Sequence, residues 1–266
     1  MKKYRKRMRF LAVVMISVMT LSSCGASGQT DPDENGKELT LQEIEALADT
    51  GVFNVNWSMV LGDYMAGTSF LIDSKEHGMK LMITAYHYLE PETVDKFDPI
   101  YLPDYIHGGE LYYARSGKDT GASLKCELVL PDADAVPVIS KDAAAFSIRG
   151  DEALKTLPLS ERKPKEGEQI YLLAKLTDGD VRNQNCVYEC QVVSCGNDQI
   201  IYRIDPKYGT TMGASGAPLV DKYGKVVGMH MAGDGKFYYG HVTESFMKQI
   251  HNGYFSEKIF KPLDTP

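Results

Sequence analysis

The sequence predicts an all-β domain of antiparallel barrels or sandwiches that ends in one helix. Between residues 51 and 243, about a dozen short runs are rich in β-branched and aromatic residues. Gly, Pro, Asp or Asn stands in nearly every gap, and no long amphipathic helix separates the runs. Short strands joined by turn residues favour antiparallel sheets over βαβ units.

The first 23 residues are typical of a secretory signal, with six basic residues between Lys2 and Arg9 before an apolar run over residues 10–21. This run is shorter than the roughly 20 residues of a spanning helix, which disfavours a retained transmembrane anchor. The letters LSSC, ending at Cys24, resemble the lipobox of bacterial lipoproteins, whose cysteine is acylated and becomes the N-terminus. We therefore expect an extracytoplasmic protein, lipid-anchored to a bacterial membrane, or secreted if the lipobox is not used.

Both ends of the domain carry a helix signal. Residues 24–50 have the small, polar and acidic composition of a linker, in which Thr40 and Glu43 predict a capping box and a short helix. Phe246 and Ile250 recur at helical spacing, which predicts a helix over residues 243–252 capped by Thr243. A tail follows over residues 253–266.

The charge balance excludes one class of partner. Removing residues 1–23 takes away six of the 29 basic residues and none of the 36 acidic ones, which leaves a net charge of −13. Nucleic-acid affinity comes largely from Lys and Arg that neutralise phosphates, so no nucleic-acid partner is expected. The 43% of hydrophobic residues is enough for a sizeable core, and we expect a monomer.

The remaining cysteines are expected to be free, buried thiols. If residues 186–195 form one strand, Cys186 and Cys190 lie about 13 Å apart, beyond the roughly 7 Å limit for a disulfide. Cys190 and Cys195 would point to opposite faces of that strand. At most Cys126 could pair with one of them, and no C-x-x-C spacing predicts a metal site.

The letters Gly-Ala-Ser-Gly occur twice, around Ser27 and around Ser215. A catalytic serine needs a base beside it and donors aimed at the developing oxyanion. Ser27 lies in the linker, whereas Ser215 stands before a predicted hairpin whose tip is formed by residues 221–224. Gly213 and Gly216 allow unusual backbone angles that could turn the amides of residues 213 and 215 toward one point, although a plain tight turn fits these letters too.

An α/β-hydrolase site is disfavoured. Its nucleophile elbow is G-x-S-x-G, but residue 217 is Ala, and a β-hairpin follows instead of a helix. The order Ser215, Asp234, His241 could imitate a hydrolase triad, but the βαβ scaffold that such a triad needs is missing.

Four segments, in order, resemble the trypsin-like serine proteases over residues 51–245: GTSFLI, MITAYH, KDAAAFSI and MGASGAPLVDKYGKVVGMHMAG. The resemblance implies two antiparallel six-stranded β-barrels with a C-terminal helix, the barrels covering about residues 51–155 and 165–243. Two departures are Tyr86, where Ala is common, and Ala214, where Asp or Asn is common. Ala214 leaves the serine loop without a polar side chain that could hold it.

Carried over by position, the resemblance makes His87 the general base, Asp142 its orienting carboxylate and Ser215 the nucleophile. Asp132 and Asp134 lie in the same interval, but only Asp142 precedes the small, apolar letters AAAFSI. The amides of Gly213 and Ser215 would form the oxyanion hole. Neither a metal nor an organic cofactor is implied.

The specificity pocket would be formed by residues just before the serine and by the strand after it, including Gly209, Thr210, His230 and Gly233. Because residue 209 is Gly and not Asp, a preference for Lys or Arg is disfavoured. The segment is most similar to bacterial glutamyl endopeptidases, with Thr210 and His230 at the positions that bind a substrate carboxylate. A core histidine is the alternative interpretation of His230.

The sequence therefore predicts a membrane-tethered serine endopeptidase that acts on polypeptides, with an acidic residue at P1. A catalytically inactive lipoprotein that keeps the protease fold and acts as a binding module is the main alternative. A surface adhesion lipoprotein is a third, for which His87, Asp142 and Ser215 would coincide by chance.

Overall fold

The structure of the protein is a computed structural model that describes residues 36–59, 62–75, 78–89, 106–115, 118–128, 142–149, 155–176, 187–208, 211 and 213–254. The chain divides into two compact units, Met1–Pro32 and Asp33–Pro266, and every described residue belongs to the second. The predicted signal segment, Cys24, Ser27 and residues 255–266 lie outside the described residues. Within the described ranges, no helix has the length and apolar character needed to cross a membrane.

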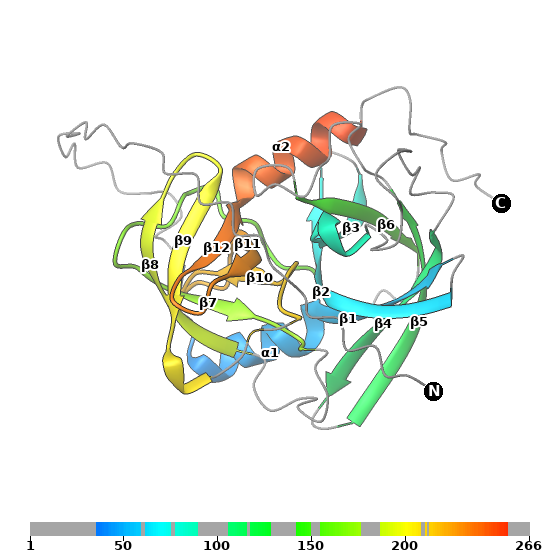
Figure 1. Cartoon of the computed structure of the whole chain (residues 1–266), viewed down its shortest axis with the longest axis horizontal. Helices are drawn as coiled ribbons and strands as arrows, with labels where there is room; N and C mark the ends of the chain where they lie inside the picture. Colours follow the sequence, from blue (N-terminus) through cyan, green and yellow to red (C-terminus); the bar gives the residue numbers. More distant parts are fainter. Residues whose placement is uncertain are drawn as a thin grey trace, which may run out of the picture. The chain divides into compact units, whose positions relative to one another are not determined.

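Six strands of the C-terminal half form a closed antiparallel barrel in the order β10-β11-β12-β9-β8-β7 (Figure 1). Burial alternates along β9, where Ile200, Tyr202 and Ile204 are buried and Arg203 is exposed, whereas all three residues of β10 are buried. A period of two is expected for a strand that has one buried face. The strands are β7 (Gln169–Leu173), β8 (Val187–Cys195), β9 (Gln199–Ile204), β10 (Pro218–Val220), β11 (Val226–Gly233) and β12 (Tyr238–Val242).

Six strands of the N-terminal half pair in the succession β1-β2-β3-β6-β5-β4, and β4 also pairs with β1. All of these pairings are antiparallel, so the prediction of a mostly β protein is confirmed. The strands are β1 (Val52–Met59), β2 (Gly62–Ser74), β3 (Met79–Thr84), β4 (Ile106–Arg115), β5 (Lys118–Leu128) and β6 (Ala144–Arg149). Two short 3-10 helices, η2 (Tyr86–Leu89) and η6 (Pro206–Tyr208), follow β3 and β9.

A bulge in β8 changes the expected positions of two cysteines. The register of β8 against β9 shifts between Val192 and Ser194, so that Cys190 pairs with Ile204 and Cys195 with Ile200. The extra residue turns Cys195 to the same side as Cys190, and both contact one core cluster. The prediction that they point to opposite faces is therefore wrong.

Both of these thiols are free, as predicted, but only Cys190 is fully buried and Cys195 is half-buried. Burial raises the pKa of the Cys195 thiol and raises that of Cys190 further. Cys186 lies outside the described residues, and Cys126 lies in β5.

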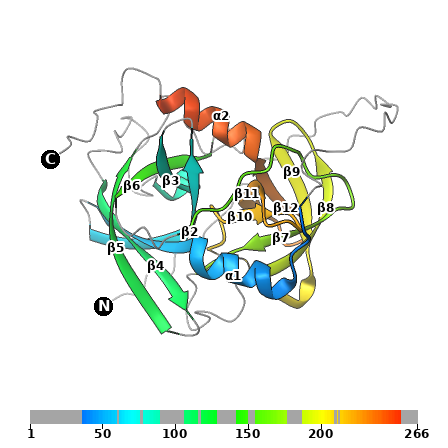
Figure 2. The same cartoon turned by 180° about the vertical axis from the view of Figure 1, so that it is seen from behind.

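Helix α1 (Leu41–Gly51) is part of the folded core, although the sequence placed it in a linker (Figure 2). The predicted capping box is present: Glu43 N donates to Thr40 Oγ1 over 3.3 Å, and Thr40 N donates to Glu43 Oε2 over 2.7 Å. The side chains of Ile44 and Ala48 have no exposed surface and pack in a cluster to which both halves of the domain contribute. The helix contacts β1, β4 and β8.

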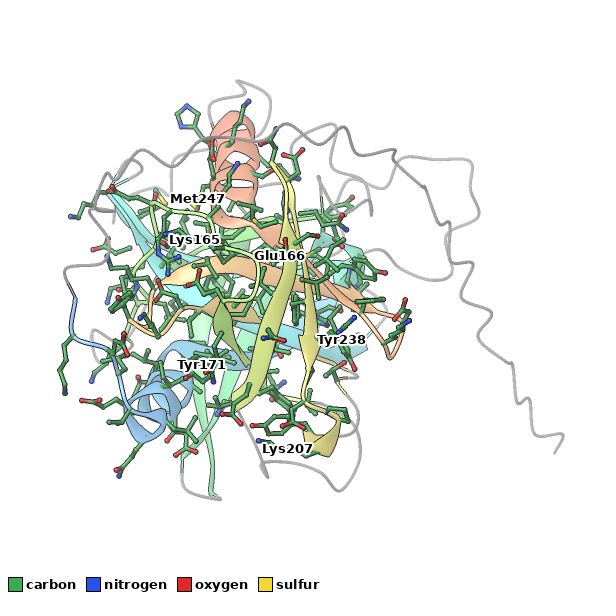
Figure 3. All side chains as sticks on the ribbon, turned by 90° about the vertical axis from the view of Figure 1, so that its left-hand side faces the viewer. Lys165, Glu166, Tyr171, Lys207, Tyr238 and Met247 are labelled. Carbon is green, nitrogen blue, oxygen red and sulfur yellow. The ribbon has the colours of Figure 1, made fainter. Side chains whose placement is uncertain are left out.

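Helix α2 (Thr243–Tyr254) packs on β11 and β12 (Figure 1). Phe246 and Ile250 are fully buried, as their spacing predicted, and Met247, labelled in Figure 3, packs against the same cluster. Thr243, expected to be the cap, is the first helical residue. Its hydroxyl donates to Val226 O over 2.8 Å, which joins the helix to β11.

The burial of α1 leads to a prediction about stability. Replacing Ile44 by Ala removes fully buried methyl groups, and we expect the free energy of unfolding to fall by about 2–4 kcal/mol. Leu41, on the same helix, is 47% exposed, so Leu41→Ala is the matched control and should change the free energy by about 0.5 kcal/mol or less. Chemical denaturation followed by circular dichroism measures both, and equal effects would contradict the core role of α1.

Candidate active site

His87 and Asp142 are joined by two hydrogen bonds. His87 lies in η2, three residues after the end of β3, and Asp142 lies two residues before β6. Because β3 and β6 pair with Thr84 opposite Ala144, the residues beyond these ends meet. The backbone N of His87 donates to Asp142 Oδ1 over 2.7 Å, and His87 Nδ1 lies 2.6 Å from Asp142 Oδ2.

The two side chains differ in exposure. Asp142 is 4% exposed, so its carboxylate is buried and not a solvated residue at the start of a strand. The His87 side chain is 29% exposed and therefore reaches solvent. An ionised carboxylate only accepts hydrogen bonds, so the neutral tautomer of His87 that fits this contact has its proton on Nδ1 and its lone pair on Nε2. A neutral imidazole held in this way can accept a proton from a hydroxyl.

The backbone around Ser215 is held by glycines at positive φ. Gly213 has φ 89° and Gly216 has φ 85°, values that L side chains rarely adopt. A Cβ atom on Gly216 would lie 2.2 Å from Thr68 O and 2.8 Å from Ala85 N. The serine loop, residues 211 and 213–217, therefore packs against Thr68 on β2 and against Ala85, which lies two residues before His87. This packing explains the glycine at position 216.

The Ser215 hydroxyl donates to the backbone O of Met231 over 2.9 Å. Its backbone is fixed by neighbours on either side, since Thr68 N donates to Ser215 O over 3.0 Å and Gly216 N donates to His230 O over 2.8 Å. The hairpin after the serine forms as predicted: Gly224 N donates to Asp221 O over 3.0 Å at its tip. The serine thus stands between β2 and β11.

His230 is buried beside two tyrosines. It is 2% exposed, its Nδ1 is hydrogen-bonded to the hydroxyl of Tyr202, and its ring lies 6.1 Å from that of Tyr238. Tyr238, labelled in Figure 3, stacks on Tyr202 with 5.8 Å between ring centroids. Burial, with a smaller effect of the charge on His87, lowers the pKa of His230 to about 3.

The hydrogen-bond direction at His230 follows from these environments. Burial raises the pKa of Tyr202 well above its ordinary value, so the phenol remains protonated. A protonated phenol donates to Nδ1 of the neutral imidazole, which leaves the proton of His230 on Nε2. His230 can therefore donate one uncharged hydrogen bond from Nε2.

The other predicted pocket residues are only partly described. Gly233 is exposed, and a Cβ atom there would lie 2.3 Å from Cδ1 of Tyr238, so the packing of this tyrosine requires a glycine. Gly209 and Thr210 lie outside the described residues, and so do the alternative carboxylates Asp132 and Asp134. In the described ranges, no group of three or more His, Cys, Asp or Glu side chains could hold a metal ion.

The alternative set of Ser215, Asp234 and His241 is not assembled. Asp234 accepts hydrogen bonds from Lys236 N and Phe237 N in the turn between β11 and β12. The Nε2 atom of His241 lies 3.0 Å from Ser245 Oγ, on α2. The sequence interpretation that set this order aside is therefore confirmed.

A buried carboxylate bonded to Nδ1 of a histidine, beside a serine on a glycine loop, is an arrangement found in serine peptidases. A family model, the trypsin-like peptidase domain, matches residues 67–229. The chain belongs to the trypsin-like peptidase domain family. Comparison with curated protein sequences gives no match.

Solved structures of serine proteases share the fold at low sequence identity. The active form of the Rv3671c protease from M. tuberculosis is 14% identical, with a TM-score of 0.56 over 94% of this chain and 97% of that chain. A serine endoprotease from Yersinia pestis is 14% identical, with a TM-score of 0.56 over 81% and 67% of the two chains. The HtrA-type protease AlgW, crystallised with a tripeptide, has a TM-score of 0.56 at 14% identity over 82% and 64%.

Three residues of the site were not predicted from the sequence. Tyr202 lies within an ordinary alternating strand, and Met231 contributes only a backbone oxygen. Thr68 belongs to the segment GTSFLI, which was part of the family resemblance, but the letters alone assign it no contact. Their partners lie far away in sequence, so no local pattern could have identified them.

The burial of His230 predicts a loss of stability in acid. The unfolded chain takes up a proton on this histidine near its ordinary pKa of 6.5, whereas the folded protein does so only near 3. The free energy of unfolding therefore falls as the pH drops below 6.5, by about 2 kcal/mol from this group at pH 5. Denaturation at pH 7.5 and pH 5 should show that His230→Gln loses less stability than the wild type, whereas parallel losses would contradict the assignment.

Proposed function

We propose that the protein is an extracytoplasmic, membrane-tethered serine endopeptidase that hydrolyses peptide bonds through His87, Asp142 and Ser215. The family membership supports a serine peptidase, and the observation that carries the proposal is the pair of hydrogen bonds between His87 and the buried Asp142. In the N-terminal half, β4 is the last of six successively paired strands and also pairs with the first, β1, which supports a second six-stranded barrel. The signal segment and Cys24 support the lipid anchor, and we propose a monomer.

In the proposed mechanism, the Ser215 hydroxyl turns from Met231 O toward Nε2 of His87. Nε2 takes the hydroxyl proton as the oxygen attacks the peptide carbonyl, and an acyl-enzyme forms when this proton passes to the leaving amine. Asp142 holds the imidazole in the required tautomer and stabilises the imidazolium. The amides of Gly213 and Ser215 donate to the oxyanion, at about 3–4 kcal/mol for each donor in comparable sites.

One observation favours an inactive binding module as the second candidate function. The Ser215 hydroxyl is hydrogen-bonded to Met231 O, and this bond must be broken before the proton can pass to His87. A chain in which the hydroxyl never leaves Met231 O would keep the fold and could bind peptides without cleaving them.

Labelling with a fluorophosphonate probe separates the two candidates. We expect the folded protein to be labelled, labelling to be lost in Ser215→Ala, and labelling to persist in Ser27→Ala, which is the matched control because the same letters surround it. Asp142→Asn should slow peptide hydrolysis by about 10³- to 10⁴-fold because the imidazole tautomer is no longer fixed. Absence of labelling in folded wild-type protein would favour the binding module.

The proposal includes an acidic residue at P1, as the similarity to glutamyl endopeptidases suggests. His230 would donate from Nε2 to an oxygen at the end of the P1 side chain, and Thr210 would be a second donor. A glutamate offers such an oxygen, and so does a glutamine. Because His230 is uncharged, a preference for Glu over Gln must come from groups other than this imidazole.

Peptides that differ only at P1 test this preference. We expect Glu and Gln peptides to be cleaved with a kcat/KM at least about tenfold above that of the Met peptide, because Met leaves the Nε2 donor unpaired. His230→Ala should remove most of this difference. A Glu-to-Gln ratio above one is the result that an acidic preference requires, and a fast Met peptide would contradict the role of His230.

A further inference from the structure

We propose that Thr68, on β2, is a positioning residue that holds the oxyanion-binding part of the serine loop through its hydroxyl. This inference rests on the proposed function, because it concerns the geometry of the same site. Thr68 has no exposed surface, so it acts on a substrate only through the residues that it contacts.

Two hydrogen bonds connect Thr68 to the serine loop. Its backbone N donates to Ser215 O over 3.0 Å, and its hydroxyl donates to Gly213 O over 3.1 Å. One residue of the N-terminal half thus holds the carbonyl groups on both sides of Ala214. This connection joins residues that lie 145 positions apart in the sequence.

The contact with Gly213 O fixes a whole peptide unit. The same peptide unit contains the backbone N of Ala214, which donates to Thr211 O over 2.9 Å. With both its oxygen and its N–H engaged, the plane of this peptide cannot rotate freely. The amides of Gly213 and Ser215 flank this plane, so their directions depend on it.

The hydroxyl proton of Thr68 has two possible acceptors. Besides Gly213 O, the backbone O of Lys175 lies 3.0 Å from Oγ1, and Lys175 N donates to the same Oγ1 over 3.1 Å. The Lys175 oxygen already accepts from Asn54 Nδ2 over 2.5 Å. A hydroxyl has one proton, and the Lys175 oxygen already has a shorter bond from Asn54, so we assign the Thr68 proton to Gly213 O.

Thr68 also reaches the segment that leads to His87. Its backbone O accepts a hydrogen bond from Thr84 Oγ1 over 2.9 Å, and Thr84 is the last residue of β3. Thr84 has 1% exposure, so this bond is shielded from water. The residue therefore contacts both the strand before the proposed base and the loop of the proposed nucleophile.

The composition of the loop explains why an outside contact is needed. Ala214 has only a methyl group, and this side chain is fully buried in the core. Gly213 has φ 89° and lacks a side chain that would restrict its rotation. Neither Gly213 nor Ala214 has a polar side chain that could hold the peptide between them, and the Thr68 hydroxyl supplies a hydrogen bond to it from another strand.

The test compares two substitutions that differ in the hydroxyl. Thr68→Val keeps the branched shape and removes the hydroxyl, whereas Thr68→Ser keeps the hydroxyl and removes a methyl group. We expect Thr68→Val to lower kcat by about 10- to 100-fold with KM changed less than about threefold, and Thr68→Ser to stay within about threefold of the wild type in both constants. Titration with a fluorophosphonate counts the folded, reactive sites in each sample.

A second variant keeps the inference testable if Thr68→Val does not fold. In Asn54→Ala the oxygen of Lys175 loses its donor and competes for the Thr68 proton, so kcat should fall about three- to tenfold. Combining both substitutions should lower kcat no further than Thr68→Val alone. Normal kcat in both single variants, or equal losses in Thr68→Val and Thr68→Ser, would overturn this inference. An unlabelled, inactive wild type would instead overturn the proposed function.

Discussion

The close approach of the serine loop to β2 and β3 is the constraint on which the site depends. Gly216 has no Cβ, and any side chain there would overlap the backbone O of Thr68 and the N of Ala85. Only this contact distance allows Thr68 N to bond Ser215 O, and only then does the loop lie beside the segment that leads to His87. The two halves of the domain therefore contact each other through backbone atoms at the site. The side chains of His87 and Ser215 lie next to this contact.

Sequence patterns predicted what depends on neighbouring residues. Runs of β-branched and aromatic residues between turn residues predicted the strands, and helical spacing predicted α2. The ends of paired strands account for the meeting of His87 and Asp142. The sequence could not show that α1 is buried, because the acidic composition around it is also that of a linker, and Ile44 finds its partners only after folding. The bulge in β8 that turns Cys195 inward could not be predicted, because no residue type in this strand marks the position of the extra residue. Tyr202 and Thr68 could not be assigned because their contacts are made between distant strands.

The environment of His230 leaves this side chain able to donate a hydrogen bond while it remains uncharged. A tyrosine on one ring nitrogen and complete burial keep the His230 imidazole neutral at any pH well above its pKa of about 3. His87 and His230 interact electrostatically, but His87 can take up a proton while His230 stays neutral. In the proposed mechanism, the positive charge that forms on His87 would have an uncharged neighbour, which avoids the repulsion that a second imidazolium would cause.

The fixed start of the domain limits how far the protein can reach. Leu39 N donates to Lys222 O, and Glu38 pairs with Lys222, so the chain is already attached to the turn between β10 and β11 before α1 begins. On the proposed anchor at Cys24, only the stretch from there to Gly36 can act as a tether. Twelve residue steps span at most about 40 Å when fully extended. The proposed active site would therefore stay close to the bilayer. Proteins that extend far from the membrane would reach it only with their membrane-proximal segments.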